Sequence, residues 1–155
     1  MKPRPYAAGT EVPVEKSRAE IERLLSRHGA AQLGIVSDAE QGLAVVLFTI
    51  AGRQVRLRVP LPRLQEVRAA CRQGEFRGDP VSRWEQLSRE RWRAVLLLVR
   101  AKLELVELGI STIEREFLAD IALPNGQTVG EHLRPQLEEA YRSGRMPPLL
   151  PGGGS

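Results

Sequence analysis

Residues 43–59 carry the pattern that most constrains the fold. LAVVLFTI at 43–50 is dense in β-branched and aromatic side chains, as central strands are. After a tight turn at 51–53, residues 54–59 alternate between apolar and polar side chains, and Pro60 and Pro62 end the run. A shorter strand at 32–36 and a polar turn at 38–42 precede them. The sequence therefore predicts a three-stranded antiparallel meander.

A segment with the periodicity of an amphipathic helix precedes the meander. Ser17 and Glu20 have the spacing of a capping box, which predicts that a helix begins there. Its apolar face ends at about His28, and Gly29 follows as a C-terminal cap.

A long amphipathic helix is predicted from Asp79-Pro80 to about Leu108, with Gly109 ending it. At 1.5 Å per residue it spans about 43 Å. Its apolar stripe consists of Trp84, Leu87, Trp92, Val95, Leu96, Val99, Leu103 and Val106. Residues 61–79 allow two interpretations, a short helix with Leu64, Val67 and Cys71 on one side, or a basic loop.

Two short helices are predicted near the C-terminus. Ser111 and Glu114 form a second capping-box pattern, and Thr128 and Glu131 form a third, with Pro135 expected to kink or restart the helix that follows. The predicted fold class is α+β: a helix, the three-stranded antiparallel meander, the long helix, then these two helices. We expect a flexible arm at 1–13, a single domain at 14–145 and an irregular tail at 146–155.

Composition excludes several protein classes. No apolar run approaches the roughly 18 residues of a membrane span, and residues 1–13 lack the apolar stretch of a secretory signal. Cys71 is the only cysteine, which rules out an internal disulfide and predicts a reducing cytoplasm. We expect no cofactor, no catalytic residue and no metal site, because the only histidines, His28 and His132, read as structural residues. The sequence therefore predicts a protein that is not an enzyme.

Arginine is concentrated in the middle of the chain. Residues 53–100 contain twelve arginines and five acidic residues, whereas residues 101–155 contain five basic and eight acidic ones. Arginine binds phosphates bidentately, so such a region favours a polyanion, and nucleic acid first. A solvated surface with pairs such as Arg89–Glu85 and Arg93–Glu90 is the alternative. The candidate nucleic-acid-binding residues are Arg53, Arg56, Arg58, Arg68, Arg72, Arg77, Arg89, Arg93 and Arg100.

These arginines are predicted to form two rows. Arg53, Arg56 and Arg58 are expected on the outer face of a strand, and Arg89, Arg93 and Arg100 on one side of the long helix. Aromatic residues for base stacking are few, since the tryptophans read as core residues and only Phe76 lies in a basic segment. The aliphatic run at 94–99 predicts burial against a second copy of the chain, or else full burial within one copy.

Two stretches resemble a known family: VPVEKSRAEIERLLSRHGA at 12–30 and RWRAVLLLVRAKLELVELGISTIEREFLADIALPNGQTVGEHLRPQLEEAYRSGRMPPLLP at 91–151. They are similar to small, uncharacterised proteins of tailed phages and prophages from GC-rich bacteria. Because genes of that family lie among replication and recombination genes, the resemblance implies a DNA-linked role.

The order of elements is also similar to the core of Redβ-like single-strand annealing proteins. That resemblance implies a basic groove between sheet and helix that holds single-stranded DNA, and assembly into rings or filaments. Arg53, Arg56, Arg58, Arg89 and Arg93 would line the groove.

The leading hypothesis is a phage-encoded accessory protein of DNA recombination or replication that binds or anneals single-stranded DNA. It would be a homo-oligomer in the cytoplasm of a bacterial host, away from membranes, with a host or phage replication protein as a further partner. One alternative is a small phage protein that docks on a host enzyme and modulates it. Another is a structural or assembly protein of the virion.

Overall fold

The computed structural model describes residues 6–147, with side chains from Val14 onward. Its elements are α1 (Tyr6–Arg27), β1 (Ala31–Asp38), β2 (Leu43–Ile50), β3 (Arg53–Pro60), α2 (Leu64–Arg72), α3 (Pro80–Glu107), α4 (Ile113–Glu116), the 3-10 helix η1 (Leu118–Asp120) and α5 (Val129–Ser143). The predicted α+β class and order of elements are confirmed.

The sheet has the order β1-β2-β3 and is antiparallel throughout. β2 and β3 meet at a two-residue turn, Ala51-Gly52, in which both residues have positive φ. Such a turn matches the right-handed twist of the strands that it joins. β1 carries a bulge between Ala31 and Gly34, where Gln32 also has positive φ.

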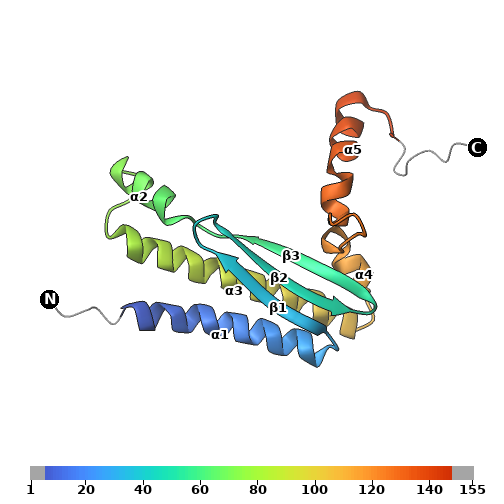
Figure 1. Ribbon diagram of the computed structural model, residues 1–155, viewed down its shortest axis with the longest axis horizontal. Coiled ribbons are helices and arrows are strands. Elements are labelled where there is room, and N and C mark those ends of the chain that lie inside the picture. The colour runs from blue at the N-terminus through green and yellow to red at the C-terminus, as the bar shows by residue number, and fades with distance from the viewer. Residues whose placement is uncertain (1–5, 148–155) are drawn as a thin grey trace, which may run out of the picture.

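One face of the sheet packs on α1 and α3, which lie side by side beneath it (Figure 1). Alternate residues of β2 and β3 are buried on this side, including Val46, Phe48 and Val55. Leu25 of α1 and Val99 of α3 meet them in one continuous core. The layers are therefore two helices and a sheet whose other face is not covered by any helix of residues 6–147 along most of its length (Figure 1).

The C-terminal segment closes the β3 edge. Val55 bridges Ile121, and the Ala122 amide donates to the Gln54 carbonyl at 2.8 Å. Phe117 is fully buried beneath this junction and meets the Phe48 ring edge to face at 5.5 Å. These contacts place η1 and the first turn of α5 beside β3, while the rest of α5 projects from the body (Figure 1).

Some predicted helix ends are confirmed. Asp79 caps α3 by accepting from the Ser82 amide, with Pro80 in the first turn. Gly29 and Gly109 follow α1 and α3 with positive φ, and Thr128 and Glu131 form both bonds of their capping box. The helical interpretation of residues 61–79 is the right one, because α2 buries Val67 against the body.

Other predicted ends are wrong. Ser17 lies inside α1, which begins at Tyr6, so residues 6–13 are helical and only 1–5 of the predicted arm fall outside the described residues. Thr112, not Ser111, caps α4. Of the two outcomes predicted at Pro135, a restart does not occur, because α5 continues through this residue, and a kink stays a prediction. Of the predicted tail, residues 148–155 lie outside the described part of the chain.

Candidate nucleic-acid interface

The predicted arginine rows do not form one groove. Cross-strand partners share a face, and Arg56 and Arg58 pair with Leu47 and Val45, which point away from the helices. The α3 row lines a different groove, of about 650 Å³, whose walls come from α1 and α3 alone. Because the sheet and the core separate the two rows, the predicted groove between sheet and helix is wrong.

Arg53 is also misplaced by the prediction. It pairs with Ile50 across the hairpin, and Ile50 is buried in the core, so Arg53 lies on the helix side of the sheet at its rim. The reason is strand alternation, which puts residue 53 on the same face as Val55. Its Nε donates to Glu114 Oε2 at 3.2 Å, which ties the hairpin end to α4.

Four arginines from three segments line an open groove beside β3, which we call the sheet-side groove. They are Arg56 and Arg58 of β3, Arg63 at the N-cap of α2 and Arg134 of α5. The volume is about 650 Å³, and the acidic residues in its lining are Asp120 and Glu131. This arrangement gives the groove an excess of positive charge.

Arg56 and Arg58 are held in place by the first turn of α5 and the loop before it. Arg58 Nη1 donates to Glu131 Oε1 at 3.3 Å, and Arg56 donates to the Gly126 carbonyl and lies 3.9 Å from Glu131. The Thr128 backbone amide, followed by Arg58 and Arg56, lowers the pKa of Glu131 despite partial desolvation. Arg58 keeps 56% of its side chain exposed, so its remaining N–H donors face solvent.

Arg63 reaches the groove over a glycine. Its Nε and Nη2 donate to the Gln41 carbonyl at 3.1 and 3.0 Å. Gly42 has a φ of +64°, and a Cβ there would lie 2.8 Å from Arg63 Cγ and 2.8 Å from the Leu61 carbonyl oxygen. Glycine is therefore required at position 42, where the Arg63 side chain passes close to the backbone.

Arg134 and Asp120 complete the lining. Within residues 14–147, no ion pair involves Arg134, whose guanidinium is exposed. Burial raises the pKa of Asp120, against the opposing charge of Lys102. No sequence pattern pointed to Arg134, since only the docking of α5 on β3 brings it to the groove.

An apolar strip lies beside the sheet-side groove on the outer face of the sheet. Val36, Val45 and Arg58 are neighbours across the three strands, as are Gly34, Leu47 and Arg56. Val36 is 61% exposed. Apolar and cationic side chains are therefore presented together on this face.

The remaining predicted arginines lie elsewhere. Arg68 and Arg72 are exposed on α2, and Arg77 is exposed in the loop before α3. Arg89, Arg93 and Arg100 share the α1–α3 groove with Lys16, and Arg100 lies 3.6 Å from Glu20. The alternative pairs Arg89–Glu85 and Arg93–Glu90 do not form among the described residues.

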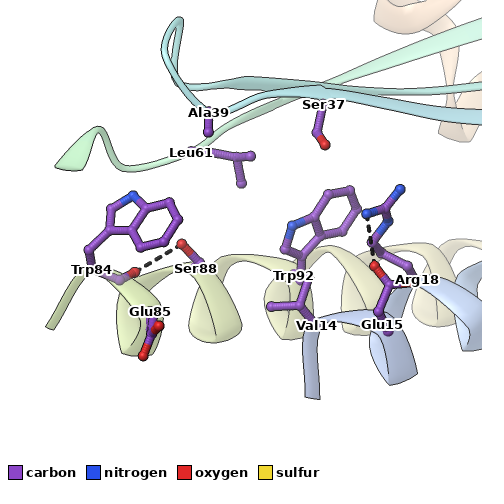
Figure 2. Close-up of a pocket in the computed structure, with 10 residues that line it drawn as sticks. All are labelled: Val14, Glu15, Arg18, Ser37, Ala39, Leu61, Trp84, Glu85, Ser88 and Trp92. Atoms are coloured by element: carbon purple, nitrogen blue, oxygen red, sulfur yellow. Dashed lines mark hydrogen bonds and ion pairs between the residues drawn. The ribbon is translucent and has the colours of Figure 1, made fainter. Parts of the chain in front are cut away.

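A third cavity, of about 360 Å³, lies between the layers beneath the β1–β2 turn (Figure 2). Trp92 is buried there, with the Arg18 guanidinium 5.5 Å from its ring centre, and Trp84 donates through Nε1 to the Pro62 carbonyl at 2.8 Å. Trp92 is therefore a core residue, as predicted, whereas Trp84 is half-buried and lies outside the core cluster. Phe76 is half-buried, 6.0 Å from the Arg83 guanidinium.

Between residues 14 and 147, no group of three His, Cys, Asp or Glu side chains is arranged to hold a metal ion. None of the helices between residues 6 and 147 combines the length and the hydropathy needed to cross a bilayer. Comparison of the chain with protein-family models, curated proteins and solved structures found no match.

Proposed function

We propose that this protein binds single-stranded nucleic acid across the outer face of its sheet, with phosphates in the sheet-side groove. The observation that carries the proposal is the convergence of Arg56, Arg58, Arg63 and Arg134 on one open groove. Guanidinium groups bind phosphate through paired donors, and those of Arg56, Arg58 and Arg63 are already positioned by contacts to the protein.

The apolar strip supports a preference for single strands. Unpaired bases expose apolar faces, which a duplex buries within its stack, and Val36, Val45 and Leu47 lie directly beside the arginines. Since no aromatic residue lies in this strip, base contacts would be weak and phosphate contacts would dominate. We therefore expect little sequence preference and a steep loss of affinity with salt.

The proposed setting is the cytoplasm of a bacterial host, where a phage-encoded accessory protein would act in DNA recombination or replication. The resemblance of residues 12–30 and 91–151 to the phage family supports it.

Fluorescence anisotropy tests the proposal, with one labelled mixed-sequence DNA oligonucleotide presented as a single strand and as a duplex over a salt series. The informative variant is Arg58→Gln/Arg134→Gln, and the matched control is Arg89→Gln/Arg93→Gln in the α1–α3 groove. Each removes two positive charges. We expect tighter binding of the single strand, and a salt slope reduced by about 1.4 in the first variant, since each lost phosphate contact on a single strand contributes about 0.7. The control should keep the slope of the wild type.

Three results would contradict the proposal. Absence of binding at the lowest salt would remove nucleic acid as the ligand and favour an acidic protein partner. Tighter binding of the duplex would contradict the proposed preference for single strands. Equal slopes in the two variants would show that bulk charge, not the sheet-side groove, attracts the oligonucleotide.

A further inference from the structure

The α3 helix carries a second apolar stripe on the side opposite the core. Ala94, Leu98, Ala101, Leu105 and Leu108 follow one another at alternating spacings of four and three, the repeat by which one helix face packs on another helix. Leu98 is 44% exposed and Leu108 65% exposed, and only Leu105 is half-buried. We call this set the outer stripe. The full burial of the 94–99 run within one copy is therefore wrong.

The α5 helix is the other element with an exposed apolar face. None of its residues is buried, and beyond its first turn it stands away from the body (Figure 1). Leu137 and Tyr141 are 59% and 85% exposed. They share a shallow apolar groove of about 530 Å³ with Leu133, Ala140 and Met146. We call this face the arm stripe.

A 15-residue helix of this kind is only marginally stable by itself. Isolated helices of about 12–15 residues are marginal in water, and Pro135 removes one of the backbone hydrogen bonds of α5. Packing of the arm stripe on another apolar surface would supply the stability that the isolated helix lacks. The outer stripe of the same copy is out of reach, because α5 projects from the sheet on the side away from α3 (Figure 1).

We propose that the arm stripe of one copy docks on the outer stripe of a second copy. Charge supports this pairing. The arm groove has one charged lining residue, Arg145, and the outer stripe is bordered on one side by the exposed carboxylates Glu90 and Glu104. Neither carboxylate has an ion pair within residues 14–147. On the other side of the outer stripe Arg91 donates to the Pro60 carbonyl and Lys102 pairs with Glu116, so those two cations already have partners.

Pairing of two outer stripes with each other is disfavoured by the same charges. In an antiparallel pair centred on Leu97, Glu90 of one copy would face Glu104 of its partner, and Glu104 would face Glu90. Like charges opposite each other destabilise a helix pair. The contact between arm and outer stripe joins different surfaces, so it is head-to-tail, and each copy can both give an arm and receive one.

Sedimentation velocity without nucleic acid tests this assembly over a wide range of protein concentration. One variant, Leu137→Asp, places a charge in the arm stripe, and another, Leu98→Asp, places one in the outer stripe. Val36→Asp is the control, since it places the same charge on an exposed apolar residue of the sheet, outside both stripes. Thermal melts by circular dichroism verify that each variant folds.

We expect the wild type and Val36→Asp to grow in mass with concentration, and each stripe variant alone to remain monomeric. An equimolar mixture of the two stripe variants should form dimers, because the intact arm of Leu98→Asp docks on the intact outer stripe of Leu137→Asp. Glu104→Arg should weaken assembly, and adding Arg145→Glu should restore it.

The proposal is overturned if the wild type is monomeric throughout. It is overturned too if either stripe variant still assembles alone, because that result indicates pairing of identical surfaces. A mixture that remains monomeric also overturns it, because an intact arm stripe and an intact outer stripe would then be present together without docking. Since no oligonucleotide is present, these outcomes are independent of nucleic-acid binding.

Discussion

The burial of Phe117 leads to a prediction about how the C-terminal segment is held on the sheet. Its ring is completely buried, meets the Phe48 ring at an interplanar angle of 84°, and lies under Lys102 Nζ, 5.4 Å from the ring centroid. Because Phe117 lies between α4 and η1, it anchors the segment that carries α5 to β3. Replacing Phe117 with a smaller side chain should destabilise the whole fold.

The expected magnitude depends on how much of the ring each substitution removes. Phe117→Ala removes the whole buried ring and leaves a cavity, for which losses of about 3–5 kcal/mol are usual. Phe117→Leu keeps most of the apolar area but loses the aromatic pair, about 0.5–1.5 kcal/mol, and the cation–π interaction, about 0.5–1 kcal/mol. We therefore expect about 1–2.5 kcal/mol for the leucine variant. Total stabilities of about 5–15 kcal/mol make both losses measurable.

Urea unfolding followed by circular dichroism measures these free energies. A double-mutant cycle with Phe48→Leu isolates the ring pair, and its coupling energy should be about 0.5–1.5 kcal/mol. Phe76→Leu is the control, because Phe76 is only half-buried near Arg83 and its substitution should cost less than about 1 kcal/mol. If Phe117→Ala costs no more than Phe76→Leu, the C-terminal segment is not anchored through this ring and the reasoning fails.

Two further predictions concern the turn and the groove. Ala51→Asn should stabilise the fold by about 0.5–1 kcal/mol and raise Tm by roughly 1–4 °C in calorimetry, because Asn tolerates the φ of +50° better than Ala; an unchanged or lower Tm contradicts this. Glu131→Gln should lower stability at neutral pH. The pKa of Glu131 is depressed in the folded protein, so its ionised form contributes stability above the ordinary value of 4.5 that is lost as pH falls through the folded pKa. Urea titrations should therefore converge for wild type and variant in acid, and a difference that persists there would show that the amide disturbs the capping box instead.

The features that the sequence predicted correctly are local ones. The Ala51-Gly52 turn, the Asp79 cap and the Thr128–Glu131 box depend on a few neighbouring residues, so their spacing is informative. The Ser17–Glu20 spacing misled because the same residues fit the interior of a helix that begins upstream, at Tyr6. Capping patterns locate a helix start only where no helix already runs through them.

The candidate site was harder to predict because it depends on which faces meet. Alternation correctly put Arg56 and Arg58 on the outer face, and the same rule, applied to Arg53, would have removed it from that row. Nothing in the sequence showed that Arg89 and Arg93 lie along α1 instead of along the sheet. Arg134 joins the site only through tertiary contacts between η1, β3 and α5.

The packing of α1 on α3 has a consequence for synthesis of the chain. His28 and Glu107, which touch at the end of this helix pair, are 79 positions apart, whereas the hairpins of the sheet are local. Hairpins form in about 1–10 μs, so the sheet can be complete long before α3 leaves the ribosome. At about 5–20 residues per second, the residues between Pro60 and Glu107 take roughly 2–10 s to add. For those seconds the apolar face of the sheet around Phe48 has only α1 to cover it, which makes this stage the one most exposed to aggregation and to chaperone binding.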